Sequence, residues 1–286
     1  MKFLIFTTIL FLTNISKPKA LNRNIPIVLW SGLGDNFENV NYVVNQLEML
    51  TLRKIYVIQF TKFPSLDTII SYFFPLFQVT YACNWLHYNK KHFLNGFDGI
   101  GISQGGVFLR ILSQTCTNGP KMVNLLTLAS PHRGISHVPM CSICDAIITA
   151  YNISEIVYNH SYKSSSITFL SYWHDVYQEK LYREKSLIGY MNYHGKKINF
   201  ERLIMIQQLD DDLVLPHQSA CFEYYNPKLG QNHIQSFNES EIYWFDTIGL
   251  KKLYDSNNMV CISNKGRHND IKITFIAETV MKYFID

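Results

Sequence analysis

The sequence predicts an α/β domain in which a mostly parallel β-sheet is covered by helices on both faces. Short apolar runs, often rich in β-branched residues, alternate with longer amphipathic stretches along most of the 286 residues. Runs that are apolar on both faces are typical of strands in a parallel sheet buried between helices. The composition, 47% hydrophobic and 17% charged, fits a large core and excludes intrinsic disorder, collagen and coiled coil.

Six runs have the character of buried strands. Each is short and largely apolar, and each leads into glycine, proline or polar residues that indicate a turn. In chain order, strands are expected at residues 25–30, 55–60, 97–102, 122–129, 203–208 and 259–263.

Four stretches between or after these runs are amphipathic. Their apolar residues lie three and four positions apart, which is the spacing of one helix face. Helices are therefore expected at residues 40–50, 76–90, 104–114 and 271–284.

The alternation stops between residues 139 and 200, where polar and aromatic residues predominate. We expect this segment to form a mainly helical cap, inserted over the carboxyl edge of the sheet. A separate small domain is the alternative interpretation, but the segment has few aliphatic residues for a core of its own. No Gly/Ser/Pro linker divides the chain, so residues 21–286 are expected to form a single domain.

Residues 1–20 have the pattern of a secretory signal peptide. Lys2 precedes an apolar run at 3–12, which is too short to cross a bilayer but has the length of a signal-peptide core. A buried first strand or helix is the alternative, but Lys17-Pro-Lys-Ala20 would end such an element. Cleavage is expected after Ala20 or nearer Ser16. Removing this segment lowers the net charge from +4 to +1.

A secretory route has consequences for the rest of the chain. No later stretch is long and apolar enough for a membrane span, so we expect a lysosomal or secreted protein without a transmembrane anchor. The six cysteines would then meet an oxidising compartment, in which disulfides persist. Three Asn-x-Ser glycosylation acceptors agree with this route, at Asn152, Asn159 and Asn238.

The strongest local motif is Gly101-Ile-Ser103-Gln-Gly105. It follows the predicted strand 97–102 and opens the predicted helix 104–114. A Gly-x-Ser-x-Gly motif in that context is typical of a tight strand-to-helix turn that projects a nucleophilic serine. We therefore predict Ser103 to be a nucleophile.

A serine nucleophile requires a base held by an acid, and in proteins with this motif the order along the chain is Ser, acid, His. His268 follows the last predicted strand and is the expected base. His233 has no strand leading into it, and His217 follows the candidate acids too closely.

The acid is expected in the loop after strand 203–208, where three consecutive aspartates occur at 210–212. Asp211 fits an Asp-x-x-Val pattern that is common for this acid, and Asp212 is the alternative. A calcium site is a rival interpretation of the three carboxylates, but the rest of a calcium-binding loop is lacking.

A glycine-rich turn, Ser31-Gly-Leu-Gly-Asp35, follows the first strand. It lacks the Lys-Ser/Thr of a phosphate-binding loop. Small residues would instead let the Leu33 amide approach a reacting carbonyl. Together with the Gln104 amide at the start of the helix, it would form an oxyanion hole.

Other chemistries fit less well. Cys141 and Cys144 with His132 and His137 offer ligand types for zinc, but such cysteine pairs usually oxidise in secreted proteins. His132 precedes the acid in the chain and is interpreted as structural or as lining the cleft. The small net charge and the lack of a basic stripe argue against nucleic-acid binding. We expect neither a metal nor another cofactor.

The chain resembles the palmitoyl-protein thioesterase family from about residue 25 to the C-terminus. The most specific piece is Gly101-Ile-Ser-Gln-Gly-Gly-Val-Phe-Leu-Arg110, where the serine motif continues into a Phe-Leu-Arg helix. Further matching pieces are Gly32-Leu-Gly-Asp35, Met122-Val-Asn-Leu-Leu126, Ser171-Tyr-Trp-His-Asp175 and Gly249-Leu-Lys251.

This resemblance implies an α/β-hydrolase fold and a serine hydrolase. The family's nucleophile falls on Ser103, its acid on Asp211 and its base on His268. Its oxyanion donors fall on Leu33 and Gln104. The sequence departs from the family at Asn36-Phe37, which replaces an adjacent cysteine pair, and at Ser31, which replaces a histidine.

The resemblance also implies a disulfide pattern. The family's cysteine pattern suggests that Cys83 pairs with Cys116 and that Cys141 pairs with Cys144. Cys221 and Cys261 have no family partners, so they are either buried thiols or an extra bridge.

The activity implied by the resemblance is hydrolysis of long-chain fatty acyl thioesters, chiefly palmitoyl groups on cysteines of proteins or peptides. S-acylated proteins or peptides would be the partners. A lipase or carboxylesterase and an acyl-CoA thioesterase are alternatives that use the same triad. A catalytically silent lipid-binding protein is a further alternative, disfavoured by the presence of every catalytic element.

Overall fold

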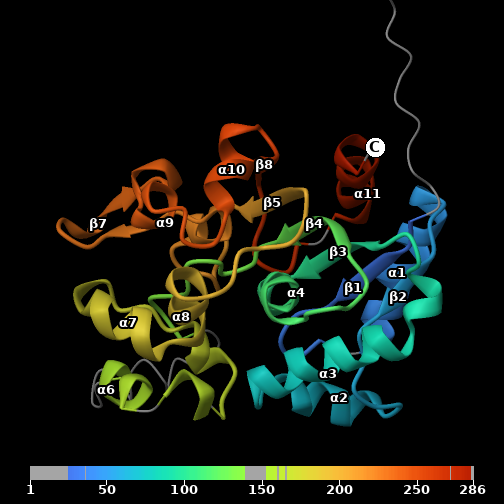
Figure 1. The fold of residues 1–286 in the computed structure, drawn as a ribbon, viewed down its shortest axis with the longest axis horizontal. Coiled ribbons are helices and arrows are strands. Elements are labelled where there is room, and N and C mark those ends of the chain that lie inside the picture. Colours follow the sequence, from blue (N-terminus) through green and yellow to red (C-terminus); the bar gives the residue numbers. More distant parts are fainter. Residues whose placement is uncertain are drawn as a thin grey trace, which may run out of the picture.

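The computed structural model describes residues 25–35, 37–138, 153–159, 161–164, 166–270 and 272–284. Within these residues, six strands form a sheet in the order β2-β1-β3-β4-β5-β8, and each neighbouring pair is parallel (Figure 1). The predicted fold class is thereby confirmed. The strands are β1 (Ile27–Trp30), β2 (Ile55–Val57), β3 (Phe97–Ile102), β4 (Met122–Leu128), β5 (Arg202–Gln208) and β8 (Met259–Asn264).

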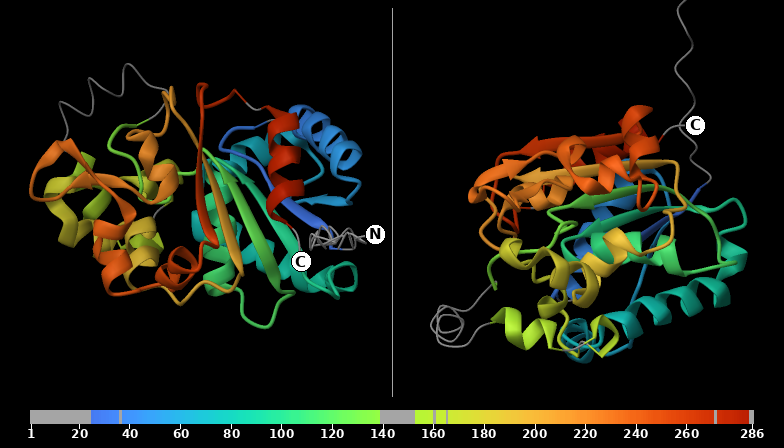
Figure 2. Two further views of the ribbon diagram at one scale, coloured as in Figure 1. Left: turned by 90° about the horizontal axis from the view of Figure 1, so that it is seen from above. Right: turned by 60° about the vertical axis from the view of Figure 1, so that its left-hand side comes forward.

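Helices cover both faces of the sheet (Figure 2). On one face, apolar residues of two helices pack against Ile100 and its strand neighbours. These helices are α1 (Phe37–Thr51) and α11 (Ile273–Tyr283). A second core of buried apolar residues lies on the other face of the sheet. Its helical side chains come from α3 (Pro75–Tyr88), α4 (Gln104–Thr115), α8 (Leu187–Tyr193) and α10 (Leu250–Asp255).

The burial of the central strands explains their composition. Every residue of β1 and of β3 is buried, so neither strand has a solvent face that would require alternating polar residues. Because the strands are parallel, the loops after their carboxyl ends meet at one edge of the sheet, where α/β folds place their ligands.

Five short elements were not predicted from the sequence. They are α2 (Pro64–Ser71), α9 (Glu241–Trp244), α10 and the antiparallel pair of β6 (Tyr224–Asn226) and β7 (Gly230–Gln235). Each is too short to give a clear period of apolar residues. His233 lies on β7 rather than in a loop, and it is exposed.

The described part of residues 139–200 contains short helices and 3₁₀ turns. These are α6 (Ile153–Tyr158), η2 (Tyr162–Ser164), η3 (Phe169–Tyr172), η4 (Val176–Gln178), α7 (Glu179–Lys185) and α8. Cys141, Cys144, Asn152 and the predicted signal peptide lie outside the described residues. In the part of the chain that is described, no helix combines the length and apolar character needed to cross a membrane.

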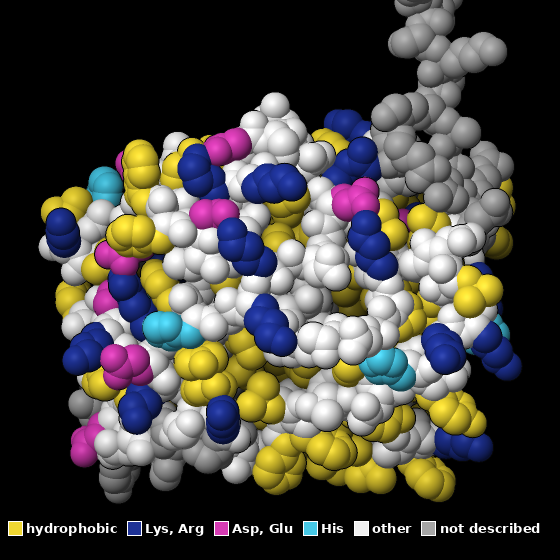
Figure 3. All heavy atoms as spheres, in the orientation of Figure 1, with side chains coloured by type: hydrophobic (Ala, Val, Ile, Leu, Met, Phe, Trp, Pro, Cys, Tyr) yellow, Lys and Arg dark blue, Asp and Glu magenta, His cyan; other side chains and the backbone are white. Residues whose placement is uncertain are grey.

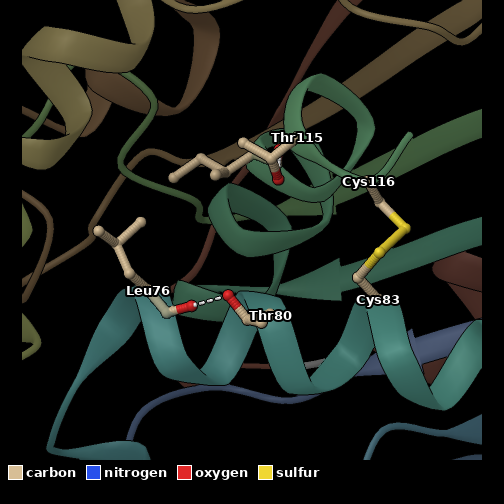
Figure 4. Close-up of a disulfide and its surroundings, with 6 residues drawn as sticks. Leu76, Thr80, Cys83, Thr115 and Cys116 are labelled. Atoms are coloured by element: carbon tan, nitrogen blue, oxygen red, sulfur yellow. Dashed lines mark hydrogen bonds between the residues drawn. A yellow bond between two sulfur atoms is a disulfide. The ribbon is translucent and has the colours of Figure 1, made fainter.

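Two disulfides occur among the described residues. Cys83 on α3 is bonded to Cys116, which follows α4, with 5.5 Å between their Cα atoms (Figure 4). This bridge confirms the pairing that the resemblance implied. Cys221 is bonded to Cys261 of β8, so these two cysteines form an extra bridge rather than free thiols.

Candidate active site

Ser103 lies in a strained turn between β3 and α4. Its φ of 51° is unusual for a residue with a side chain and is sustained by the packing around it. A Cβ atom on Gly101 would lie 2.2 Å from the Gly106 Cα, and one on Gly105 would lie 2.0 Å from the Trp30 carbonyl oxygen. The turn can therefore close only with glycine at both positions.

Three of the predicted residues are connected by hydrogen bonds. Ser103 Oγ lies 2.9 Å from His268 Nε2, and both carboxylate oxygens of Asp211 lie 2.9 Å from His268 Nδ1. A carboxylate only accepts hydrogen bonds, so Nδ1 carries the hydrogen and Nε2 of the neutral imidazole accepts from the serine hydroxyl. His268 and Asp211 are both buried. The geometry is one in which an imidazole can take the proton of the serine hydroxyl, and the catalytic roles of the three residues stay a prediction.

The pairing of β5 with β8 explains why Asp211 and His268 meet. The loops that follow these strands are joined by backbone hydrogen bonds from Leu209 to Asn264 and from Asp210 to Gly266. Asp211 Oδ1 also accepts the backbone amides of Leu213 and Val214. These bonds orient the carboxylate toward the imidazole.

The neighbouring aspartate takes a different position. Asp212 is exposed and is ion-paired with Arg267. Slight burial would raise the pKa of Asp212, but the hydrogen bonds from Arg267 outweigh this effect and lower the pKa. Burial lowers the pKa of the half-buried His217. Asp212 also accepts a hydrogen bond from the backbone of His268. Among the described residues, the His268 ring is hydrogen-bonded to Asp211 and Ser103, and not to Asp212, His217 or His233.

The glycine-rich turn lies beside Ser103. A Cβ atom on Gly32 would be 3.4 Å from the Ser103 Cβ. The Gly32 amide donates to Asp35 Oδ2 at 2.6 Å, and the Gly34 amide donates to Ser71 Oγ at 2.9 Å. The Leu33 amide between them makes no hydrogen bond to any described residue. It is therefore available to a bound oxyanion.

Gln104 begins α4, so its backbone amide lies at the positive end of the helix dipole. Its buried side chain accepts from the Tyr172 hydroxyl at 2.7 Å and donates to the Ser71 carbonyl at 3.1 Å. These bonds fix the residue from both sides. Gln104 follows Ser103 directly in the chain, and Leu33 lines the same cavity as Ser103. That their amides form an oxyanion hole stays a prediction.

Asp35 is a site residue to which sequence analysis assigned no role, although it ends the quoted Gly32–Asp35 motif. The residue as a whole is exposed, but Oδ2 turns inward to the Gly32 amide. Burial of the carboxyl raises the pKa of Asp35, and the Gly32 amide and His268 offset this effect only in part. Its structural effect is to hold the oxyanion turn closed.

A cavity of about 230 Å³ opens over these residues. Ser103, His268 and the glycine-rich turn form its polar side. Its apolar lining comes from six parts of the chain, including Tyr72 after α2 and Phe169 and Tyr172 of η3. Most other aromatic residues of the 139–200 segment do not reach it. The cavity therefore offers an apolar surface next to the nucleophile.

His132 lies outside this cavity and is structural. It is fully buried, its ring stacks on Phe222 at 4.7 Å, and its Nε2 is hydrogen-bonded to Thr127 Oγ1. Burial holds the pKa of His132 well below its ordinary value. Among the described residues, the one group with metal-ligand spacing is Cys83, His87 and Cys116. Its two sulfurs form a disulfide, so they cannot act as thiolate ligands.

Comparisons with known proteins agree on one family. The family model described as palmitoyl protein thioesterase matches residues 26–268. The Caenorhabditis elegans protein palmitoyl-protein thioesterase 1 is 25% identical over 288 residues, which covers 92% of this chain and 93% of the relative. The lysosomal thioesterase PPT2 homolog of Drosophila melanogaster is 22% identical over 203 residues, 67% of this chain and 68% of the relative.

A Schizosaccharomyces pombe relative is longer than this chain. It is named palmitoyl-protein thioesterase-dolichyl pyrophosphate phosphatase fusion 1 and is 30% identical over 283 residues. The match covers 93% of this chain but 44% of the fusion. Among solved structures, the RedJ thioesterase of Streptomyces coelicolor is similar with a TM-score of 0.49 at 9% identity, covering 96% of this chain and 97% of that one.

Proposed function

This chain belongs to the palmitoyl protein thioesterase family, and we propose that it hydrolyses long-chain fatty acyl thioesters, chiefly palmitoyl groups on cysteines of proteins or peptides. Family and fold support hydrolase activity of the thioesterase type. The observation that carries the finer proposal is the hydrogen-bonded series Asp211–His268–Ser103, which ends in an apolar cavity.

Acylation is the first half of the proposed reaction. Ser103 Oγ attacks the thioester carbonyl carbon while His268 Nε2 takes the hydroxyl proton. Asp211 keeps the imidazole in the required tautomer and stabilises its charged form. The C–S bond then breaks, and the cysteine sulfur leaves with the proton from His268.

The oxyanion turn acts during this step. The Leu33 and Gln104 amides would donate to the oxygen that becomes negatively charged in the tetrahedral intermediate. Removing one such donor usually costs about 3 to 4 kcal/mol of transition-state stabilisation. Asp35 would contribute indirectly, because its bond to the Gly32 amide holds the turn in place.

Deacylation completes the cycle. His268 takes a proton from water, the resulting hydroxide attacks the acyl-enzyme carbonyl, and the bond to Ser103 Oγ breaks. A fatty acid is released and the serine regains its proton. Apart from water, both half-reactions use the same residues of the chain.

The apolar lining of the cavity next to Ser103 supports the proposed preference for a long acyl group. Each buried CH₂ contributes about 0.8 kcal/mol, so chain length can strongly affect kcat/KM. The leaving thiolate needs little assistance because a thiol is far more acidic than an alcohol. The main requirement of the site is therefore its apolar lining, to which Tyr72, Phe169 and Tyr172 contribute.

The proposal includes passage through the secretory pathway, with the lysosome as the main destination and secretion as the alternative. Two disulfides support an oxidising compartment. Asn159 and Asn238 are exposed, as glycan attachment requires. A lysosomal name among the relatives points the same way.

Glycosylation can be tested on protein purified from cells. Glycosidase treatment would reduce its apparent mass, and each Asn→Gln variant would lack the mass of one glycan.

A substrate comparison tests the proposed activity. The purified protein is assayed with a palmitoyl-cysteine peptide, palmitoyl-CoA and a matched oxygen ester. We expect the peptide thioester to have the highest kcat/KM. Preference for the oxygen ester would indicate a lipase or carboxylesterase, and preference for palmitoyl-CoA would indicate an acyl-CoA thioesterase. Binding without turnover of any of them would indicate a lipid-binding protein.

The nucleophile is tested with a fluorophosphonate probe. We expect labelling at Ser103, competition by the palmitoyl thioester, and a loss of turnover of at least about 10⁴-fold in Ser103→Ala. An unchanged thermal unfolding curve serves as the control for folding. Labelling at another residue, or activity in Ser103→Ala, contradicts the proposed mechanism.

A further inference from the structure

Six large hydrophobic side chains are exposed within the short stretch that contains α2 and the start of α3. Their exposed fractions lie between 41% and 70%, and the residues are Phe63, Leu66, Ile69, Phe73, Phe74 and Phe77. In Figure 3, hydrophobic side chains gather along the lower edge of the molecule, where α2 and α3 lie in Figure 1. We call these six residues the α2–α3 apolar surface. Contiguous exposed apolar patches usually mark a binding surface.

Helix α2 is oriented opposite to an ordinary surface helix. Its polar side chains face the protein: Asp67 accepts the amides of Phe60 and Thr61, Thr68 donates to the Asp35 carbonyl, and Ser71 Oγ accepts the Gly34 amide. Phe63, Leu66 and Ile69 lie three positions apart and form the opposite face, which is exposed. Core formation normally requires the reverse arrangement. The apolar face of α2 is therefore left for an external partner.

The turn after α2 presents two further aromatic rings. Phe74 has a φ of 54°, an unusual conformation for an aromatic residue. It is sustained by backbone bonds from Phe74 to Ser166 and from Thr168 to Tyr72. The fully buried Gln78 amide donates to the Phe73 carbonyl at 2.7 Å and to the Ile70 carbonyl at 3.0 Å. The exposure of Phe73 and Phe74 is thus built into the fold.

The surface is continuous with the catalytic cavity. Tyr72 connects α2 to Phe73 and lines the cavity, and Phe73 pairs with Ile167, two residues before the cavity residue Phe169. The Tyr72 hydroxyl also lies against Gly34, because a Cβ atom there would be 2.4 Å from it. A partner that covers the α2–α3 apolar surface would therefore lie beside the entrance to the site.

The chemistry of the surface favours lipid over protein. Between residues 61 and 80 the charged residues are Lys62, which is exposed, and Asp67, whose carboxylate is turned inward. Phenylalanine, leucine and isoleucine next to a lysine are typical of segments that enter the interface of a bilayer. Phenylalanine is also common at protein interfaces, but the residues that dominate binding there are enriched in Trp, Tyr and Arg, and none of the six is one of these.

We propose that the α2–α3 apolar surface docks the enzyme on a lipid bilayer, so that its cavity takes acyl chains from S-acylated proteins or peptides held at the membrane. The inference rests on the proposed function for the identity of the substrate. The docking itself rests on the inverted polarity of α2 and the fixed display of Phe73 and Phe74.

Vesicle binding tests the proposal. The full-length protein is sedimented with phosphatidylcholine vesicles, with and without added phosphatidylserine. We compare wild type, the double variant Ile69→Glu/Phe77→Glu, and the control Leu229→Glu/Phe245→Glu. The control residues are 63% and 73% exposed but lie near β7 and α9, away from α2. We expect the Ile69/Phe77 variant to bind at least about tenfold more weakly, and the control and Ser103→Ala to bind like wild type.

Hydrolysis assays with a soluble and a vesicle-anchored thioester distinguish an effect on docking from an effect on catalysis. On a water-soluble short-chain thioester, all variants except Ser103→Ala should match wild type, because Ile69 and Phe77 do not line the cavity. On a palmitoyl peptide anchored in vesicles, the Ile69/Phe77 variant should lose about tenfold in rate. No turnover by wild type of either the short-chain thioester or the palmitoyl peptide would refute the proposed function and leave the binding result intact.

Four outcomes would overturn the docking proposal. Wild type that fails to bind vesicles, or a variant that binds them equally well, refutes it directly. A wild-type dimer that Ile69→Glu/Phe77→Glu converts to monomers, without vesicle binding, assigns the surface to a second copy of the chain. If Ile69→Glu/Phe77→Glu loses activity on a dispersed long-chain thioester in the absence of vesicles, the α2–α3 apolar surface binds the acyl chain of the substrate instead.

Discussion

Two adjacent aspartates show how position within one loop determines chemistry. Asp211 is buried, accepts two backbone amides and faces His268. Asp212 points outward to Arg267. The difference arises because backbone hydrogen bonds hold the loop after β5 against the loop after β8. A substitution that keeps the size of each side chain can therefore separate their roles.

Asp211→Asn should lower kcat by about 10⁴-fold with a short-chain thioester, because an amide no longer selects the catalytic tautomer of His268. Asp212→Asn is the matched control and should stay within about threefold of wild type, since exposed ion pairs contribute little. Steady-state kinetics near neutral pH measure both effects. A larger loss in Asp212→Asn would reverse the assignment of the acid.

At the scale of elements, the cross-link between α3 and α4 stabilises the helical layer next to the site. Cys83 and Cys116 lie 33 residues apart in the sequence, and α4 begins immediately after Ser103. Figure 4 shows the bridge at the end of α4, beside α3. Closing a loop of this length restricts the unfolded chain.

Cys83→Ser/Cys116→Ser should lower the free energy of unfolding by about 3 kcal/mol. Denaturant unfolding of the oxidised wild type and the double variant measures the change. The Cys221–Cys261 bridge remains in the variant and keeps the comparison specific. An unchanged free energy of unfolding would mean that the bridge contributes nothing to stability.

Elements also show what sequence patterns can predict. The six strands of the parallel sheet were predicted from their short apolar runs, and helices α1, α3, α4 and α11 from apolar residues that recur along one face. The same pattern does not reveal that the apolar face of α2 is turned to solvent. Nor does it reveal the Cys221–Cys261 bridge, which depends on β5 and β8 being neighbours in the sheet.

The candidate site was predicted more completely than the elements around it. Ser103, Asp211 and His268 each follow a strand, and the loops after parallel strands converge at one edge. Chain order and motif were therefore sufficient to select them. Asp35 and Tyr72 were not assigned a role, because their contributions depend on how the glycine-rich turn packs against α2.

At the scale of the whole molecule, His174 connects three separate parts of the chain. Its ring stacks between Tyr182 of α7 and Tyr224 of β6, at 3.5 and 3.9 Å. Its Nδ1 lies 2.6 Å from the Arg133 carbonyl oxygen, and its Nε2 lies 2.6 Å from Glu179 Oε1. Both partners accept hydrogen bonds when Glu179 is ionised, which favours a hydrogen on each ring nitrogen, whereas burial opposes the charged form and lowers the pKa of His174. A buried His174–Glu179 contact therefore joins the helical segment to the loop after β4.

This pair predicts an acid-dependent loss of stability. Burial opposes ionisation, but His174, Arg133 and Arg183 outweigh it and lower the pKa of Glu179 from its usual 4.5 to about 2. A lowered pKa means that the stabilisation is complete above about pH 4.5 and is lost as the pH falls toward 2. The expected contribution is at most about 3 kcal/mol.

Glu179→Gln should remove this part of the pH dependence and lower the free energy of unfolding near neutral pH by about 3 kcal/mol. Glu184→Gln, at an exposed position on α7, is the matched control and should behave like wild type. Urea unfolding at a series of pH values measures both. Parallel pH curves for Glu179→Gln and wild type would contradict the assignment.

In the proposed mechanism, Ser103 carries the acyl group during thioester hydrolysis. Mass spectrometry of protein quenched in acid during turnover of a palmitoyl-cysteine peptide tests it most directly. We predict one palmitoyl group on the proteolytic fragment that contains Ser103, and none in Ser103→Ala. A palmitoyl group on another residue, or continued turnover by Ser103→Ala, would contradict the proposed role of Ser103.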